Sequence, residues 1–275
     1  MMNLAVYQAP GMPTCSVPPM QLELLLSKIL NLVPEYQVHI HSRRPLQLAR
    51  FRPPPNTELF QFTAAHAPAY LSLLHEKLAQ AHPEGGKIYW STTAWRILNW
   101  NPILFSVMAV HSLGKAVCLQ GSGLWVTQES IEGSALEDHP VFSGPEDELI
   151  HYAGQQIQML MGTLYTAATQ SFSLHIKLAQ KLTTDALVEC LIMQNQLAQS
   201  AVALRQDQLQ TRLDKWLNAA GLPLITGTLL LPNGQLGLNR QVCCQYYRIQ
   251  TGGECPDCTR IPMPQRLAMM AEHTH

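Results

Sequence analysis

The sequence has few charged residues. Only 13% of its 275 residues are Asp, Glu, Lys or Arg, and 18 basic side chains nearly balance 19 acidic ones, for a formal net charge of −1. A nucleic-acid-binding surface needs a concentration of Lys and Arg, so the composition gives no support for a nucleic-acid partner. Hydrophobic residues make up 47% of the chain, which is typical of a globular protein with a buried core and not of a disordered one.

Long apolar runs and nucleotide-binding loops are also missing. The longest apolar run, near Ile103 to Val110, is far shorter than the roughly 20 residues of a transmembrane helix, so any membrane association is expected to be peripheral. The segment from Met1 to Cys15 lacks the basic and apolar regions of a secretory signal. We therefore expect a cytoplasmic protein with reduced cysteines. We find no internal repeat and no glycine-rich motif for a hydride-carrying cofactor.

Cysteine, in contrast, is concentrated near the end of the chain. Four of the seven cysteines lie between Gln241 and Pro262, in the pattern Cys-Cys-x10-Cys-x2-Cys: Cys243, Cys244, Cys255 and Cys258. Four thiolates on a short loop are soft ligands, which suit zinc or an iron–sulfur cluster rather than magnesium or calcium. Gly252, Gly253 and Pro256 provide the flexibility and the turn that bring the ends of this loop together.

The adjacent cysteines bear on which metal is bound. Structural zinc sites usually contain two separated Cys-x2-4-Cys pairs, and only Cys255 and Cys258 fit that pattern. Neighbouring side chains of an extended chain point to opposite faces, so Cys243 and Cys244 can join one site only where the backbone bends sharply. A cluster with two iron atoms makes this sharp bend less necessary, because it offers two tetrahedral metal centres. The sequence has no Cys-x-His pair, so a Rieske centre is not supported. Zinc, two structural disulfides and four unligated thiols remain alternatives.

The same stretch resembles the cluster motif of the FhuF-type ferric-siderophore reductases. The resemblance includes Arg240, Tyr247 and Arg248 around the adjacent cysteines. It extends upstream to three stretches: Lys181 to Leu187, Trp216-Leu217 and Gly221-Leu222. It implies that Cys243, Cys244, Cys255 and Cys258 hold a [2Fe-2S] cluster, which is then the only catalytic group.

The resemblance also implies an activity and partners. The expected reaction is the one-electron reduction of Fe(III) in a siderophore, with the hydroxamate type favoured, followed by release of Fe(II) in the cytoplasm. The expected partners are the ferric siderophore and an external electron donor, either a ferredoxin or a flavoprotein reductase. The alternative is a non-catalytic binding module in which zinc or the cluster only stabilises the C-terminal loop.

Arginine and tyrosine side chains near the cysteines are candidates for contacts with the cluster, the substrate or the electron donor. Arg240, Arg248 and Arg260 can stabilise the more negative reduced cluster, or contact the electron donor or an anionic chelate. The alternative is that they are ordinary solvated arginines. Tyr246 and Tyr247 can shield the cluster from water or simply pack.

Hydrophobic periodicity predicts an α+β fold that is predominantly helical. Residues 1–19 are predicted to form a flexible arm, residues 20–143 a mixed α/β part, and residues 144–275 a helical part. The helical part is predicted to end in a hairpin and the cluster-binding loop, 241–262. Predicted helices cover 20–32, 67–81 and 95–113, a long helix from Glu146, and helical segments over 172–182 and 185–217. Predicted strands cover 36–41, 117–127, 222–232 and 235–239, the last two flanking Asn233-Gly234, and 131–145 is predicted to be a loop.

Two other groups of residues have both a functional and a structural interpretation. His39 and His41 share one face of a predicted strand and can bind a metal, but no third ligand is evident, and a polar strand face explains them as well. The aromatic stretch 89–100, with Tyr89, Trp90, Trp95 and Trp100, can line a substrate pocket or form core. Cys190 lies on an apolar helical stripe and is predicted to be a buried structural thiol.

Overall fold

The computed structural model describes residues 25, 28, 29, 38–41, 56, 58–126, 131–137, 139, 141–198 and 203–273. The predicted arm, 1–19, lies outside these residues. Of the first predicted helix, Leu25, Lys28 and Ile29 are described, and all three are helical. Leu25 and Ile29 are buried in the core, which is the amphipathic arrangement that their spacing predicts.

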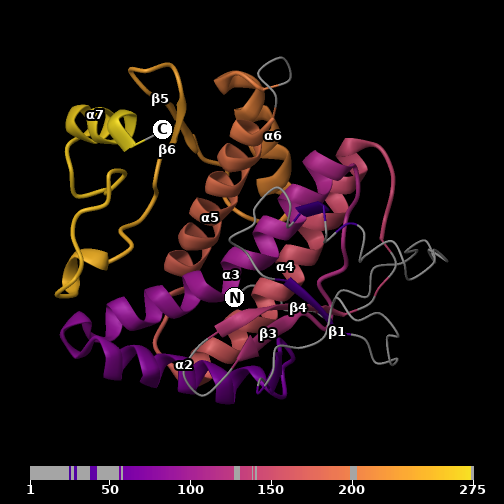
Figure 1. Ribbon diagram of the computed structural model, residues 1–275, viewed down its shortest axis with the longest axis vertical. Coiled ribbons are helices and arrows are strands. Elements are labelled where there is room, and N and C mark those ends of the chain that lie inside the picture. Colours follow the sequence, from indigo (N-terminus) through magenta and orange to yellow (C-terminus); the bar gives the residue numbers. More distant parts are fainter. Residues whose placement is uncertain are drawn as a thin grey trace.

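The described chain is predominantly helical, which confirms the predicted α+β class (Figure 1). The helices are α2 (Ala67–Ala81), α3 (Gly86–Leu113), α4 (Glu146–Ser171), α5 (Ile176–Leu197), α6 (Gln206–Ala219) and α7 (Met263–His273), with short 3-10 turns η1 (Pro83–Gly85) and η2 (Tyr246–Arg248). The strands are β1 (Val38–His41), β2 (Glu58–Gln61), β3 (Gly123–Val126), β4 (Ile131–Glu137), β5 (Thr228–Leu230) and β6 (Leu236–Leu238).

Helix α3 lies in the middle of the helical core, against α5 on one side and near α2 and α4 on others. Its apolar residues occur on all faces, as expected of a helix that is covered on all sides, and Trp95, Leu98 and Met108 are almost completely buried. The Trp95 Nε1–H donates to the Ala179 carbonyl oxygen (3.0 Å) and to Thr183 Oγ1 (3.1 Å) on α5. A buried tryptophan needs such a partner for its polar atom, so this contact fixes α3 against α5.

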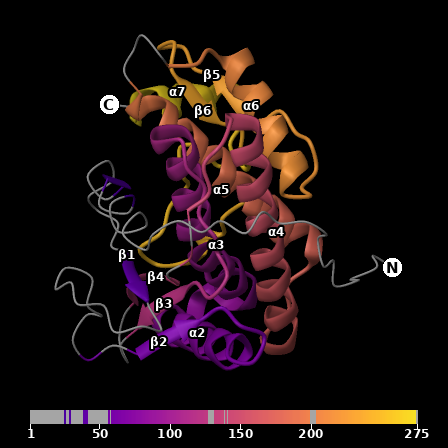
Figure 2. The same cartoon turned by 90° about the vertical axis from the view of Figure 1, so that its right-hand side faces the viewer.

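A four-stranded sheet lies beside this core, in the order β1-β4-β3-β2. Strand β1 is parallel to β4, and the β4–β3 and β3–β2 pairs are antiparallel. Figure 2 shows this sheet with α2 at one end of the molecule and the β5–β6 hairpin with α7 at the other. The predicted hairpin at Asn233-Gly234 is confirmed, since Gly234 has a φ of 81° and the Leu231 carbonyl accepts its N–H.

Several predicted boundaries are wrong for identifiable reasons. The predicted loop 131–145 contains β4, which pairs with β1 and β3. Both partner strands fall within predicted strands, but local pattern does not show which segments pair in a sheet. Helix α3 begins at Gly86 rather than at residue 95, so the aromatic stretch is helical. The predicted helical segment 185–217 is interrupted between α5 and α6, where the Asn195 side chain accepts from the Leu204 N–H (2.7 Å). Strand β2 and helix α7 were not predicted.

Within the described ranges, no helix is both long and apolar enough to cross a membrane.

The contact between α4 and α6 depends on a glycine. A Cβ at Gly154 would lie 2.4 Å from the Ala219 Cβ, whereas a Cβ at Gly162 on the same helix would have no atom within 4 Å. We expect Gly154→Ala to lower the free energy of unfolding by about 1–3 kcal/mol through overpacking. Gly162→Ala, the matched control, should raise it by about 0.5–1 kcal/mol. Urea denaturation measures both, and equal effects at the two positions would contradict this packing.

Candidate metal centre

The segment that carries the four cysteines connects β6 to α7 and runs from the hairpin to the first turns of α3 (Figure 1). Two backbone N–H groups of this segment donate to acidic side chains outside it, one on α5 and one in the exposed turn η1. The Gln241 N–H donates to Asp185 Oδ1 on α5 (2.8 Å), and the Gln250 N–H donates to Glu84 Oε1 in η1 (2.9 Å). These hydrogen bonds hold both the beginning and the middle of the loop against the protein.

The four thiols lie near one another, as predicted, and they form two pairs. Cys244 Sγ and Cys255 Sγ are 3.2 Å apart. The Cys258 thiol lies close enough to Cys243 to affect its titration. All four are free thiols, and the 3.2 Å separation is far longer than the roughly 2.05 Å of a disulfide, so the disulfide alternative is wrong for these residues.

The sharp bend that the adjacent cysteines require is present. Gln245 has a φ of 65°, an uncommon left-handed conformation for a non-glycine residue, and its N–H points back to Cys243 Sγ (3.4 Å). The second cysteine pair forms a tight turn, because the Cys258 N–H donates to the Cys255 carbonyl oxygen (3.0 Å). The backbone therefore directs four sulfur atoms toward one region from two turns.

Each pair combines one of the adjacent cysteines with one cysteine of the Cys-x2-Cys turn. Within the residues that the structure describes, no three His, Cys, Asp or Glu side chains are grouped as a site for a single metal ion. A [2Fe-2S] cluster instead offers two tetrahedral iron atoms, each of which takes two thiolates. The paired donor set fits that cluster, and it also explains how adjacent cysteines can serve one centre.

The thiols of the closer pair influence each other and respond to nearby arginines. The hydrogen bond from Cys255 lowers the pKa of Cys244, and Arg240 and Arg96 lower it further against the effect of burial. The same contact raises the pKa of Cys255, with burial as the second cause. Burial raises the pKa of Cys243, and the Cys258 and Cys244 thiols raise it further. Positive charge from Arg240 and Arg96 therefore reaches the sulfur atoms and favours thiolate at Cys244.

Two of the other cysteines, Cys190 and Cys118, lie elsewhere in the described structure. Cys190 is completely buried in the core on α5, and burial raises the pKa of its thiol, as expected of a structural residue. Burial also raises the pKa of Cys118. Cys15 lies outside the described residues. His39 and His41 are in strand β1 as predicted, but their side chains lie outside the described part, so the metal hypothesis there is not tested.

Arg240 is buried, so the interpretation of this residue as an ordinary solvated arginine is wrong. Its side chain is only 8% exposed, and its Nε–H donates to Asp257 Oδ2 (2.8 Å), which also accepts from Nη2. Burial lowers the pKa of Arg240, but Asp257, Glu189 and Asp185 outweigh it and raise the pKa above its usual range. Because Asp257 directly precedes Cys258, this ion pair fixes the tight turn that presents two of the thiols.

Arg248 and Arg260 lie on an exposed part of the loop and share one aromatic ring. The Arg260 guanidinium lies 3.8 Å from the centroid of Tyr247, and the Arg248 guanidinium lies 5.6 Å from it. Arg248 Nε–H also donates to Gln245 Oε1 (2.9 Å), the residue at the bend. Cation–π contacts thus order both arginines. Their roles toward the cluster, the substrate or the donor remain predictions.

Of the helical side chains that face the loop, sequence reasoning named Tyr89 as a possible pocket residue and did not identify the others. Tyr89, Thr93 and Arg96 follow one face of α3, and electrostatic effects connect Tyr89 and Arg96 with Cys244. Asp185 lies in the stretch Lys181 to Leu187, which carries the family resemblance, but no role was assigned to it. Burial raises the pKa of Asp185 to about 7, although the Gln241 N–H and Arg240 oppose this effect. The sequence signal that could have identified these residues is the presence of charged side chains on helices that are otherwise apolar and buried.

The aromatic stretch serves mainly as core. Trp95 is buried and Tyr89 is nearly so, while Trp90 Nε1–H donates to the His82 carbonyl oxygen (2.8 Å). Trp100 is only partly buried and lines a pocket between α3 and α5. Of the four aromatic residues, Trp100 therefore lines a pocket, and the binding of a substrate there stays a prediction.

Two neighbouring glycines provide a test of how tightly the loop is packed. A Cβ at Gly252 would lie 1.9 Å from the Tyr246 carbonyl oxygen, whereas a Cβ at Gly253 would have no atom within 4 Å. We expect Gly252→Ala to force the backbone apart, at a cost of about 1–3 kcal/mol, and to lower the amount of iron bound. Gly253→Ala should bind iron like the wild type. Iron analysis after anaerobic purification compares them, and full loading of Gly252→Ala would contradict the observed loop.

Comparison with known proteins supports the assignment of the loop. Residues 240–260 match the family described as FhuF 2Fe-2S C-terminal domain. This match covers Arg240, all four cysteines and Arg260, and it points to a [2Fe-2S] cluster at the paired thiols. No solved structure matches the chain.

Proposed function

We propose that the chain is a ferric-siderophore reductase that uses a [2Fe-2S] cluster on Cys243, Cys244, Cys255 and Cys258. The observation that carries this proposal is the pairing of these four thiols within a loop that matches the FhuF 2Fe-2S C-terminal domain. When bound, the cluster supplies one electron at a time, which is the electron count that converts Fe(III) to Fe(II). The redox partners are then an external one-electron donor and the chelated iron.

Reduction is sufficient to release the metal. Hard oxygen chelators such as hydroxamates prefer Fe(III), so the added electron weakens the complex and lets Fe(II) pass to other ligands. No proton transfer or covalent step is needed. The protein's residues have two tasks, to hold the four thiolates and to bring the chelate near them. Among the chain's residues, Asp185, Glu84 and the Arg240–Asp257 pair perform the first task by fixing the loop.

The proposal includes a ferredoxin or a flavoprotein reductase as donor and a cytoplasmic location for the reaction. Arg248 and Arg260, which are ordered on Tyr247 at the loop surface, are candidate contacts for the donor. Positive charges at such a surface favour an acidic partner and speed its association.

A reoxidation experiment tests the proposed reaction. The protein is reduced with dithionite, freed of excess reductant and mixed anaerobically with a ferric hydroxamate and a ferrous-specific chromophoric chelator. We expect the cluster absorbance to return as ferrous iron forms, with one iron reduced for each cluster oxidised. NADPH alone should not sustain turnover. If reduced protein stays reduced with hydroxamate, catecholate and carboxylate chelates alike, the binding-module alternative takes the place of the reductase.

A further inference from the structure

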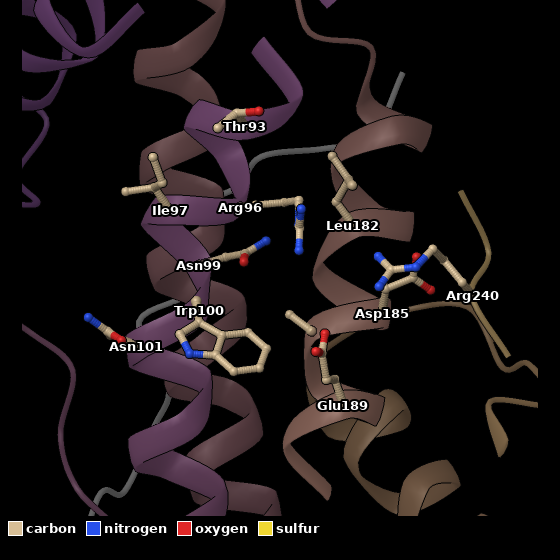
Figure 3. Close-up of a pocket in the computed structure, with 11 residues that line it drawn as sticks. Thr93, Arg96, Ile97, Asn99, Trp100, Asn101, Leu182, Asp185, Glu189 and Arg240 are labelled. Atoms are coloured by element: carbon tan, nitrogen blue, oxygen red, sulfur yellow. The ribbon is translucent and has the colours of Figure 1, made fainter. Parts of the chain in front are cut away.

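A pocket of about 380 Å³ lies between α3 and α5, next to the segment that leads into the cluster loop. Its polar lining comes from three elements: Arg96, Asn99 and Trp100 on α3, Asp185 and Glu189 on α5, and Arg240 after β6. Figure 3 shows the Arg96 and Asn99 side chains directed toward α5, and Glu189 directed toward α3. The volume is at the lower end of the range of small-molecule sites, about 300–1,000 Å³.

The pocket and the thiol pairs share structural residues. Arg240 lines the pocket and also forms the ion pair with Asp257, the residue before Cys258. Asp185 lines the pocket and accepts the Gln241 N–H at the start of the loop. Arg96 lines the pocket, and its charge acts on Cys244. A molecule in this pocket would therefore lie beside the groups that hold the cluster.

Four side chains of the pocket, Arg96, Asn99, Asp185 and Glu189, have polar atoms without a partner in the described structure. Asn99 Oδ1 and Asp185 Oδ2 are buried and have no hydrogen-bond partner among the described residues, and these two side chains are 1% and 3% exposed. Arg96 and Glu189 extend from facing helices, but neither forms a hydrogen bond or ion pair with a residue in the described ranges. Buried polar atoms normally have partners, so a group of unpaired ones in a pocket indicates a ligand.

These groups define the chemistry of that ligand. The Arg96 guanidinium requires an oxygen acceptor, and the Asn99 and Glu189 oxygens require hydrogen-bond donors such as amide N–H groups. Arg240 is already paired with Asp257, which leaves Arg96 with the carboxyl groups of Asp185 and Glu189. Burial raises the pKa of both carboxyl groups, so they are only partly ionised and the pocket carries little net charge. A strongly anionic ligand, such as a triscatecholate complex, would meet these carboxyl groups unfavourably. A neutral complex with oxygen donors and amide groups suits the pocket best.

We propose that this pocket binds one arm of a ferric trishydroxamate, with its carbonyl or hydroxamate oxygens on Arg96 and its amide N–H groups on Asn99 and Glu189. The Trp100 ring, Leu182 and Ala186 provide apolar contacts for the methylene spacers of such a chelator. The inference rests on the proposed reductase function, and it adds the place at which the substrate binds and the side chains that contact it. It also gives the unpaired residues of the α3–α5 interface a common role.

A redox-inert analogue separates binding from electron transfer. The probe is the gallium(III) complex of a linear trishydroxamate, which resembles the ferric complex in charge and size but does not accept the electron. Calorimetric titration of the oxidised, cluster-loaded protein should detect binding by the wild type. We expect Arg96→Gln and Glu189→Gln each to weaken it by about tenfold or more, because each removes a charge-assisted hydrogen bond. Arg205→Gln, at the residue that precedes α6, is the charge-matched control and should bind like the wild type.

A further variant tests whether the ligand occupies the pocket volume, without removing any polar group. Ala186 is buried on α5 and lines the pocket, so Ala186→Met should fill part of it and weaken binding of the gallium complex by a similar factor. Cluster absorbance shows whether each variant remains loaded. Wild-type protein that does not bind the complex, or variants at all three positions that bind it unchanged, would overturn the pocket assignment. The reductase proposal would survive that result if ferric hydroxamate still reoxidised the reduced wild-type protein.

Discussion

Cys258→Ser is expected to abolish the cluster. Cys258 is buried, forms a pair with Cys243 and ends the turn that the Arg240–Asp257 ion pair fixes. The substitution places a serine oxygen where a soft thiolate belongs in a site that has four donors. Metal binding contributes to the folding free energy of a loop that it orders, so the variant should also lose stability. We expect iron and sulfide below about a tenth of the wild-type content, and the same result for Cys255→Ser.

Cys190→Ala is the matched control for these variants. Cys190 is just as deeply buried, but it packs in the apolar core on α5 and should bind iron and sulfide at wild-type levels. Its loss should cost only packing, on the order of 1 kcal/mol in the free energy of unfolding. Colorimetric iron and sulfide analysis, with urea denaturation, checks both results. Full loading of both serine variants would contradict the ligand assignments.

Arg240→Met is expected to have the second largest effect, on both stability and reduction potential. The substitution leaves the partly buried Asp257 carboxylate without its partner, which should lower the free energy of unfolding by about 3–5 kcal/mol. It also removes positive charge near the sulfur atoms, so the more negative reduced cluster is less stabilised and the potential should fall. Urea denaturation and a potentiometric titration measure the two effects.

Two comparisons isolate the ion pair. Arg248→Met removes the same charge from an exposed position of the same loop, where solvent screens it, so both effects should be small. The double variant Arg240→Met/Asp257→Leu removes both charges and should recover much of the lost stability, because apolar groups can replace a buried pair. A double variant as unstable as Arg240→Met would show that the arginine acts through something other than Asp257.

The parts of the fold that local pattern controls could be predicted from the sequence. The acidic start and apolar stripe of α4, the helix over 67–81 and the hairpin at Asn233-Gly234 each depend on residues within a few positions of one another. The cysteine motif was likewise predictable from residues close in the sequence, because its spacing indicates that the four thiols come together. The sharp bend required by Cys243 and Cys244 was predicted, but its location at Gln245 was not, since glutamine gives no signal for a positive φ.

The parts that depend on distant contacts could not be predicted. Strand β4 pairs with β1, which precedes it by about ninety residues. A pairing between such distant segments leaves no signal in the local sequence, so the strand was not predicted. Asp185 binds the Gln241 backbone across 56 positions, and Arg240 pairs with Asp257 across 17 positions. The pocket combines residues of α3, α5 and the segment after β6. The Lys181 to Leu187 resemblance, the aromatic stretch 89–100 and Arg240 each pointed to part of that region, but the sequence did not show that they come together.

The metal content and redox spectrum of the anaerobically purified protein test the central claim most directly. We predict iron and acid-labile sulfide in the equal amounts of a [2Fe-2S] cluster, no stoichiometric zinc, and visible absorbance that bleaches when each chain takes up one electron. The spectrum should be lost in Cys258→Ser and retained in Cys190→Ala. A colourless protein that holds one zinc ion per chain at the same cysteines would contradict the account.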